Sequence, residues 1–313
     1  MLNHVLSQVN TVAIGGHVRP DGDCVGSCMG LYQYIKKCYP NISVDVYLEE
    51  IPDSFVMFDV VNEICHKAKE EVYDLFISLD CADKGRLGFS ETLFDKAKYT
   101  VCVDHHISND GFADENYIVA EASSTAELVF RLIDKKKIDT EIAECLYLGI
   151  VHDTGVFQYS CTSPETMEAA AYLMRKDIRA SEIIDKTYYE KTYPQNRVLG
   201  YALLHSYLTL NGKCIVSYVT QDAMNEFQVK QKDLEGIVSQ LRVTQGVEVA
   251  IFFYEIGADE YKVSLRASGD VDVSKVAQCF GGGGHVKAAG LTMKGSISNI
   301  VDALTEEIGK QLW

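Results

Sequence analysis

One short stretch near the start of the chain concentrates side chains that can bind a metal ion. His17, Asp21 and Asp23 lie in the turn His17-Val18-Arg19-Pro20-Asp21-Gly22-Asp23, directly after the apolar run 11–16. Imidazole and carboxylate groups can hold a hard divalent cation, and such a cation would support metal-assisted chemistry. Taken alone, the stretch is equally consistent with an Asp-Gly turn that has a histidine nearby by chance.

Three further apolar runs end in the same kinds of side chain. Run 75–79 is followed by Asp80, run 99–103 by Asp104-His105-His106, and run 146–151 by His152-Asp153. If all four runs are parallel strands, their endings gather at one edge of a sheet, which is where open α/β folds bind ligands. The repetition therefore predicts a binuclear metal centre, and it disfavours separate turn or cap roles for each segment.

The first half of the chain alternates short apolar segments with helical patterns, which is typical of βαβ units in a parallel sheet. Strands are expected at 11–16, 43–48, 75–80 and 99–103. Helices are expected at about 25–38, 54–68 and 125–135. The caps Ser124 and Ser163, the latter followed by Pro164, mark two helix starts. This half is interpreted as a Rossmann-like domain.

The second half has a different pattern, with strands expected at 213–220, 247–256 and 260–268 and a terminal helix at 297–311. Residues 257–260 would join two of these strands as a hairpin. The expected fold class is therefore α/β, with a parallel sheet followed by a smaller mixed-sheet α/β domain. We expect the metal-binding domain at 1–185, a helical linker at 186–208 and the second domain at 209–313.

A run of four glycines, Gly281–Gly284, precedes His285 in the second half. Consecutive glycines cost conformational entropy on folding, so a close backbone approach is the expected reason for them. Exposed N–H groups beside His285, with Lys287 near, would suit a phosphate. A flexible loop is the alternative, and Arg266 could be either a ligand-binding or a surface residue.

The composition limits the classes of partner. The chain has 313 residues, ten cysteines and a formal net charge of −16. This charge, without a long basic block, disfavours long nucleic acids as partners. No apolar run approaches the length of a membrane span and no secretion signal is recognisable, so a cytoplasmic location away from membranes is expected. The cysteines lack metal spacing and are interpreted as buried thiols; Cys24 and Cys28 could face each other beside the first motif.

These motifs together resemble those of the DHH phosphoesterase family, and within it the two-domain bacterial nanoRNase/pAp phosphatase type. The resemblance covers nearly the whole chain. The matching residues are His17-x-x-Pro20-Asp21-Gly22-Asp23, Asp80, Asp104-His105-His106, His152-Asp153-Thr154-Gly155, Arg266, and Gly281–His285 with Ala288-Ala289-Gly290.

The resemblance implies two Mn²⁺ ions per chain and a role for each matching residue. The ligands would be His17, Asp21 and Asp80 for one ion, and Asp23, Asp80, His105 and Asp153 for the other, with Asp80 bridging both and counted as catalytic. His106 would be catalytic by facing the transferring phosphoryl group, and Asp104 would orient the histidines from behind. The far end of the substrate would be held across a cleft between the domains by Arg266, Gly282, Gly283, Gly284 and His285.

The resemblance also implies a substrate class. It predicts hydrolysis of oligonucleotides of roughly two to five nucleotides to 5′-mononucleotides, of pAp to AMP, or of both, by a hydroxide bridging the metals. Hydrolysis of cyclic di-AMP or pApA is the enzymatic alternative, because the same motifs serve both activities. A catalytically inactive nucleotide-binding regulator is the alternative from another class. Base preference, the angle between the domains and the oligomeric state stay open, and a homodimer is one option.

Overall fold

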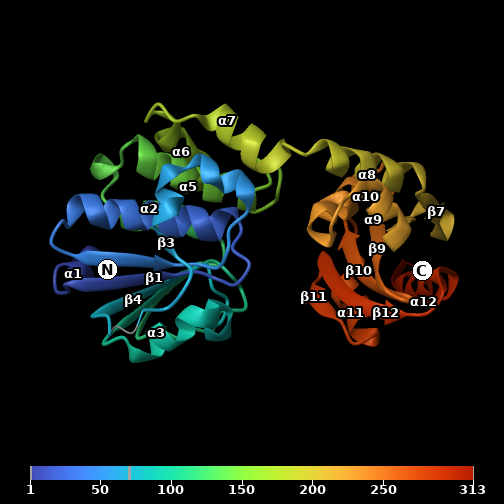
Figure 1. The fold of residues 1–313 in the computed structure, drawn as a ribbon, viewed down its shortest axis with the longest axis horizontal. Helices are drawn as coiled ribbons and strands as arrows, with labels where there is room; N and C mark the ends of the chain where they lie inside the picture. Colours follow the sequence, from blue (N-terminus) through green and yellow to red (C-terminus); the bar gives the residue numbers. More distant parts are fainter. Residues whose placement is uncertain (1, 70–71, 313) are drawn as a thin grey trace. The chain divides into compact units, whose positions relative to one another are not determined.

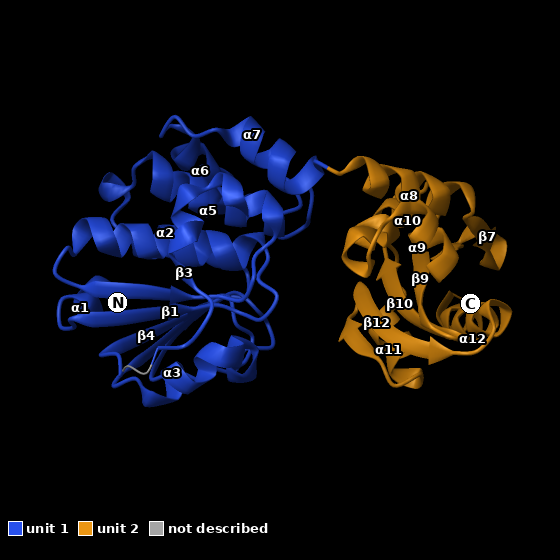
Figure 2. Ribbon diagram, in the orientation of Figure 1, with its two compact units in different colours: residues 1–190 blue, residues 191–313 orange. Residues whose placement is uncertain are grey.

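The computed structural model describes residues 2–69 and 72–312, and it contains two compact units, residues 1–190 and 191–313 (Figures 1 and 2). Each unit has its own sheet and its own buried apolar clusters. Within the described residues, no helix combines the length and the apolar character needed to cross a bilayer.

The first unit is built on a six-stranded sheet in which every neighbouring pair is parallel. Its strands are β1 (Thr11–Gly15), β2 (Ser43–Tyr47), β3 (Ile64–Cys65), β4 (Leu75–Leu79), β5 (Thr100–Asp104) and β6 (Glu115–Ile118), in the order β3-β2-β1-β4-β5-β6. The chain order reverses between β1 and β4, and ligands of such sheets bind beyond the carboxyl ends of strands at this point.

Helices cover both faces of this sheet. The helices of the first unit are α1 (Leu2–Leu6), α2 (Gly22–Cys38), α3 (Glu91–Lys96), α4 (Thr125–Leu132), α5 (Thr140–Asp153), α6 (Pro164–Met174) and α7 (Ala180–Ile184). Side chains of α2, α4 and α5 pack with Val12 and Ile14 of β1 in one buried cluster. On the opposite face, Phe76 of β4 packs with Phe94 of α3 (Figure 1).

The second unit has a six-stranded mixed sheet, in which only the pair β8–β9 is parallel. Its strands are β7 (Tyr207–Thr209), β8 (Cys214–Val219), β9 (Val249–Gly257), β10 (Glu260–Ala267), β11 (Gly283–His285) and β12 (Ala288–Lys294), in the order β11-β12-β10-β9-β8-β7. One face packs on α8 (Tyr193–Leu204), α9 (Gln221–Phe227) and α10 (Ile237–Arg242), and the other on α11 (Val273–Cys279) and α12 (Ile297–Leu312). The predicted α/β fold class, with a parallel and then a mixed sheet, is confirmed.

Two sequence predictions about local structure are wrong. Run 146–151 lies inside helix α5 and is not a strand. Every residue from Ile142 to Val151 is buried, so this stretch of the helix has no face exposed to solvent. The periodicity of such a run does not distinguish a buried helix from a buried strand. The helix expected at 54–68 is instead two short 3₁₀ turns, 53–57 and 59–63, followed by β3.

Candidate metal centre

His17 follows β1 and turns one ring nitrogen toward two carboxylates. Its Nδ1 lies 2.9 Å from the backbone carbonyl oxygen of Val18, and because a carbonyl only accepts, Nδ1 carries the proton. Its Nε2 lies 3.4 Å from Oδ2 of Asp80 and 3.6 Å from Oδ1 of Asp21. A histidine fixed in this way by its other nitrogen is typical of metal sites.

The start of helix α2 positions the two carboxylates of the first motif. Asp21 is the N-cap residue, and its Oδ1 accepts hydrogen bonds from the backbone N–H groups of Asp23 and Cys24, each at 3.1 Å. The Asp21 side chain is 57% exposed, whereas Asp23 is fully buried. Asp23 accepts hydrogen bonds from the N–H groups of Thr125 (2.6 Å) and Ala126 (2.8 Å) in the first turn of α4. These hydrogen bonds at the positive end of the helix favour the charged form, but burial and the neighbouring carboxylates of Asp80 and Asp153 outweigh them and raise the pKa of Asp23 well above its usual value.

Asp80, at the end of β4, lies between two histidines. Its Oδ2 lies 3.4 Å from Nε2 of His17, and its Oδ1 lies 3.5 Å from Nε2 of His105. Its backbone is in the left-handed region at φ 58°, which is uncommon for a residue other than glycine and is often found at functional sites. One carboxylate oxygen toward each histidine is the arrangement needed by a ligand shared between two cations.

His105 and Asp153 complete the second half of the cluster. Nε2 of His105 lies 3.0 Å from Oδ2 of Asp153 and 3.9 Å from Oδ2 of Asp23. Asp153 is the last residue of α5, which reaches the cluster because α5 packs closely on α2. A Cβ atom on Gly149 would lie 2.6 Å from Oδ1 of Asp23, so glycine at this position leaves room for the buried carboxylate.

His106 has a different partner from the other two histidines. Its Nδ1 lies 2.7 Å from Oδ1 of Asp104, and the other oxygen of Asp104 accepts a hydrogen bond from Asn109 at 2.7 Å. Nδ1 of His106 is also 3.7 Å from Oδ1 of Asp80. By contrast, His152 turns to Thr187, with Nε2 2.9 Å from its Oγ1, and it packs edge-on against the ring of Tyr188.

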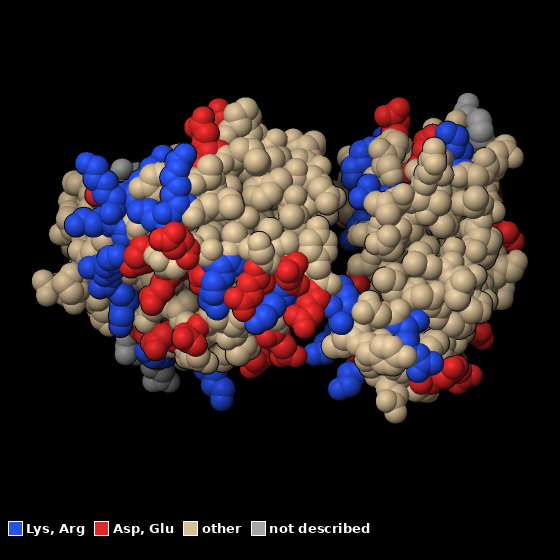
Figure 3. All heavy atoms as spheres, turned by 90° about the horizontal axis from the view of Figure 1, so that it is seen from above, with Lys and Arg blue, Asp and Glu red and all other residues tan. Residues whose placement is uncertain are grey.

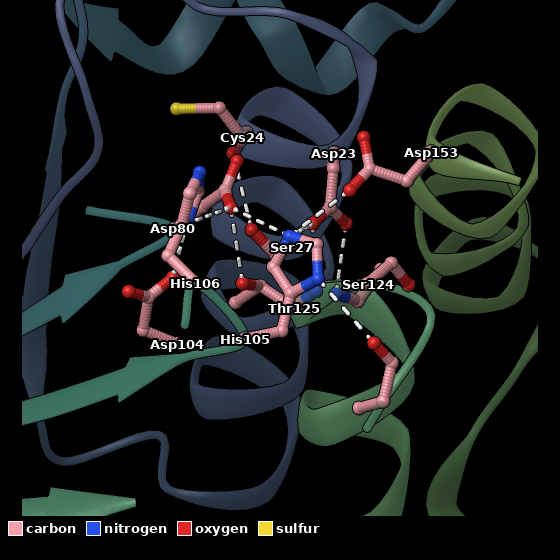
Figure 4. A network of polar contacts seen from close by, with 12 residues as sticks. Asp23, Cys24, Ser27, Asp80, Asp104, His105, His106, Ser124, Thr125 and Asp153 are labelled. Carbon is pink, nitrogen blue, oxygen red and sulfur yellow. Dashed lines mark hydrogen bonds and ion pairs between the residues drawn. The ribbon is translucent and has the colours of Figure 1, made fainter. Parts of the chain in front are cut away.

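The structure brings these side chains into three overlapping groups, and Figure 4 shows the two groups that contain His105. In each group the candidate ligand atoms lie within 4.8 Å of one another, and the groups are His17/Cys24/Asp80, Asp80/His105/His106 and Asp23/His105/Asp153. Asp80 and His105 each belong to two groups, so the three candidate metal sites share ligands. Asp21 is close to His17 but belongs to none of the three groups.

The charges in the cluster fit a cation site. Burial alone would lower the pKa of His17, but hydrogen bonds with Asp21 and Asp80 raise it to about 12. Burial alone would also lower the pKa of His105, but hydrogen bonds with Asp153 and Asp80 raise that pKa to about 12. Burial raises the pKa of Asp153 to about 6. The cluster thus brings carboxylate oxygens and imidazole nitrogens together, and these donors suit a hard divalent cation such as Mn²⁺.

Three residues that the sequence analysis did not assign also contact the cluster. Thr125 donates from Oγ1 to Oδ1 of Asp80 at 3.2 Å, Asn109 holds Asp104, and Cys24 belongs to the group of His17 and Asp80. A signal existed for Thr125, since the predicted helix start after Ser124 places backbone N–H groups where anions bind. No pattern in the sequence pointed to Asn109.

Two of the residues expected to bind the substrate in the second unit, Arg266 and His285, lie in one row across its sheet. Arg266 of β10 is opposite Ala288 of β12, and Ala288 is opposite His285 of β11. Residues paired in this way point to the same face of a sheet. The glycines have a local structural reason: a Cβ on Gly282 would lie 2.5 Å from the carbonyl oxygen of Gly290, and one on Gly284 would lie 2.4 Å from that of Ala288.

Comparison with family models then identifies both units. The model of the DHH family, N-terminal domain, matches residues 11–150, and that of the DHHA1 domain matches residues 211–311. The chain belongs to the DHH/DHHA1 phosphoesterase family. The family predicted from the sequence motifs is therefore confirmed. The chain is a phosphoesterase, and its family of hydrolases is metal-dependent.

Members of this family resemble the chain over its whole length. The bifunctional oligoribonuclease and PAP phosphatase NrnA of Thermus thermophilus is 28% identical over 306 residues, covering 95% of this chain and 90% of that protein. An exopolyphosphatase-related protein from Bacteroides fragilis has a solved structure with a TM-score of 0.91 and 26% identity, covering 99% of this chain and 94% of that chain. The cyclic-di-AMP phosphodiesterase GdpP of Bacillus subtilis is 25% identical over 339 residues, covering 98% of this chain but 49% of that protein.

Proposed function

We propose that this DHH phosphoesterase uses two Mn²⁺ ions to hydrolyse short oligonucleotides to 5′-mononucleotides, pAp to AMP, or both. The observation that carries the proposal is the position of Asp80, with one oxygen toward His17 and the other toward His105. The full-length likeness to NrnA, named as an oligoribonuclease and PAP phosphatase, supports the choice of substrate.

Each polar residue of the cluster has a distinct part in this proposal. The proposed ligands are His17, Asp21 and Asp80 for one ion, and Asp23, Asp80, His105 and Asp153 for the other. When bound, two such cations would neutralise charge on the phosphoryl group and activate water. Asp104 holds the proton on Nδ1 of His106, so Nε2 is the nitrogen left to face the substrate, where it would stabilise or protonate the phosphoryl group.

The second unit would recognise the rest of a small nucleotide. Arg266 and His285 lie on one face of its sheet, and the backbone of Gly282–Gly284 lies beside them. The net charge of −16 makes a long polyanion an unfavourable ligand. On the face of the first unit seen in Figure 3, Lys and Arg side chains gather at one end, and Asp and Glu alternate with them over the middle. A small cytoplasmic substrate is therefore proposed, and long nucleic acids are disfavoured.

Hydrolysis of cyclic di-AMP or pApA is the second candidate, and the likeness to GdpP is the observation that favours it. The chain spans only about half of GdpP, whereas it spans nine-tenths of NrnA, so we rank the linear substrates first. A regulator without activity is disfavoured because the cluster retains its buried carboxylates.

A substrate series tests the proposal. The purified protein, freed of metal by chelation, would be assayed with and without Mn²⁺ on pAp, pApA, cyclic di-AMP and RNA of two to five nucleotides. We expect Mn²⁺-dependent turnover of pAp or the short RNAs, and a loss of at least about 100-fold in kcat for Asp80→Asn with unchanged thermal unfolding. Faster turnover of cyclic di-AMP than of every linear substrate would reverse the ranking, and binding without hydrolysis would favour the regulator.

A further inference from the structure

A cavity of about 430 Å³ lies at the carboxyl ends of β1, β2 and β3, at the same edge of the sheet as the metal cluster. Its walls are formed by Arg19, Glu49, Glu50, His66 and Phe89. A larger cavity, of about 1000 Å³, lies along α2 and α5; of its cations, Lys37 and Arg179 are paired with Asp139 and Glu144, and Lys36 lies over the ring of Tyr32 at 5.7 Å from its centroid. The smaller cavity is therefore the better candidate for a ligand.

One wall residue of the cavity, Arg19, belongs to the motif that carries the proposed metal ligands. Arg19 is two residues from both His17 and Asp21, so its Cα lies within about 7 Å of theirs. Its backbone is left-handed at φ 55°. Two hydrogen bonds hold this loop: the N–H of Val18 donates to the carbonyl of Arg86 at 2.7 Å, and the N–H of Arg19 donates to Oε2 of Glu49 at 2.8 Å. A strained conformation held in this way is typical of functional loops.

The walls offer the chemistry that binds a nucleoside and its phosphate. Phe89 is half-buried, and its ring is held edge-on by Tyr47 at a centroid distance of 6.4 Å, so it can serve as a stacking surface for a base. Arg19 is exposed, and a guanidinium binds phosphate oxygens well. Nδ1 of His66 donates to the carbonyl of Leu48 at 3.0 Å, which leaves its Nε2 to accept a hydrogen bond. The exposed carboxylate of Glu50 can accept from base amino groups.

We propose that this cavity is the subsite for the nucleoside attached to the scissile phosphate, with the base against Phe89 and a phosphate oxygen on Arg19. The inference rests on the proposed function, because it needs the phosphate to lie at the metal cluster. The nucleoside is joined to that phosphate by a covalent bond, so it must occupy space next to the cluster. A volume of about 430 Å³ is in the range of small-molecule sites.

Two variants and one matched control test this subsite. Arg19→Gln removes the guanidinium, and Phe89→Leu removes the aromatic surface but keeps apolar bulk. Arg86→Gln is the control, because it removes a positive charge from the neighbouring turn without changing a wall of the cavity or the backbone carbonyl that holds Val18. Binding of AMP to the Mn²⁺-loaded protein would be measured by calorimetry. Hydrolysis would be measured on pApA and on bis(p-nitrophenyl) phosphate, which has no nucleoside.

We expect Arg19→Gln and Phe89→Leu each to weaken AMP binding and to lower kcat/KM on pApA by about 10-fold, the effect of losing one stacking or phosphate contact. In Phe89→Leu, turnover of bis(p-nitrophenyl) phosphate, which has no nucleoside, should fall less than turnover of pApA, whereas Arg19→Gln, which loses a phosphate contact, should lower turnover of both substrates. The control should match wild type in every assay.

The outcomes separate this inference from the proposed function. If both variants bind AMP and hydrolyse pApA like wild type, the subsite lies elsewhere and the inference is wrong while the function stands. If Phe89→Leu loses activity equally on both substrates, or if Arg19→Gln loses activity without weaker AMP binding, these side chains support the metal loop and do not bind the nucleotide, which also overturns the inference. If the wild type hydrolyses none of pAp, pApA and the short RNAs, the proposed function fails, and the AMP titration still decides whether the cavity binds a nucleotide.

Discussion

Nδ1 of His106 lies 2.7 Å from Oδ1 of Asp104, and this relationship fixes which nitrogen of the histidine can act. Asp104 is fully buried and also accepts a hydrogen bond from Asn109 at 2.7 Å, so its carboxylate is held on both sides. A carboxylate only accepts, and the proton of the neutral imidazole therefore stays on Nδ1. The opposite nitrogen is left available to a substrate.

Replacing Asp104 by Asn tests this relationship. The amide nitrogen of an Asn at this position would donate to Nδ1 and move the imidazole proton to Nε2, while the size of the side chain is unchanged. We expect kcat to fall by about 10- to 100-fold, with little change in KM, as at other sites where the partner that orients a histidine is lost. Steady-state kinetics with Mn²⁺ on pAp or a short RNA would measure this.

Asn109→Ala is the matched control for that experiment. It removes the hydrogen bond to Oδ2 of Asp104 but leaves the bond to His106, so its effect on kcat should be smaller. Thermal unfolding of both variants would show that the fold is retained. If the folded Asp104→Asn protein keeps the wild-type kcat, the contribution of His106 to catalysis does not depend on which of its nitrogens carries the proton.

Glu127 of α4 gives a prediction about pH and stability. It is buried, and its Oε2 accepts hydrogen bonds from Oγ of Ser123 (2.6 Å) and Oγ1 of Thr166 (2.8 Å), while Oε1 pairs with Arg131. Burial alone would raise its pKa, but these partners together lower it below the usual 4.5. The group therefore stabilises the fold above pH 4.5, and that contribution is lost as the pH falls through the lower pKa of the folded state.

Glu127→Gln should accordingly lower the free energy of unfolding by about 2 kcal/mol at pH 7.5, the loss expected for hydrogen bonds to a buried charge. The difference from wild type should shrink as the pH is lowered below 4.5. Urea unfolding followed by circular dichroism at several pH values would measure it. Glu182→Gln, at an exposed pair with Lys186, should change nothing measurable, and a Glu127→Gln difference independent of pH would contradict the prediction.

The site residues that the sequence predicted best are those whose position depends only on the strand next to them in the chain. Asp80 and Asp104 end buried strands of a parallel sheet, so the run of apolar residues before each was enough to locate them. Asp153 also lies in the cluster, although the run before it is helical. The motif residues themselves drew attention to this segment, so the wrong assignment of the element did not remove Asp153 from the candidates.

The contacts that the sequence did not predict join residues far apart in the chain. Asp23 accepts from Thr125 and Ala126 because α2, α4 and α5 pack closely, and nothing local to Asp23 indicates that partner. Asn109 is similar, since it bonds to Asp104 and to the carbonyl of Cys81 from a loop without a pattern. Such contacts depend on the packed tertiary structure.

Cys24 gives the last prediction, because it places a thiol beside the proposed metal ligands. Its Sγ lies within 4.8 Å of the ligand atoms of His17 and Asp80, and the residue is fully buried. Oxygen and imidazole ligands favour Mn²⁺, whereas thiolates favour softer metals such as Cd²⁺. A cation held by His17 and Asp80 would therefore have the thiol of Cys24 beside it.

Cd²⁺ added to the metal-free protein should therefore produce an ultraviolet charge-transfer band from a cadmium–thiolate bond, with release of the thiol proton, and Mn²⁺ should produce none. Cys24→Ser should lose this band. Cys28→Ser, one helical turn further along α2 and equally buried, should keep it, because Cys28 is not in the group with His17 and Asp80. A band that persists in Cys24→Ser, or that disappears in both variants, would show that the thiol of Cys24 does not reach the metal.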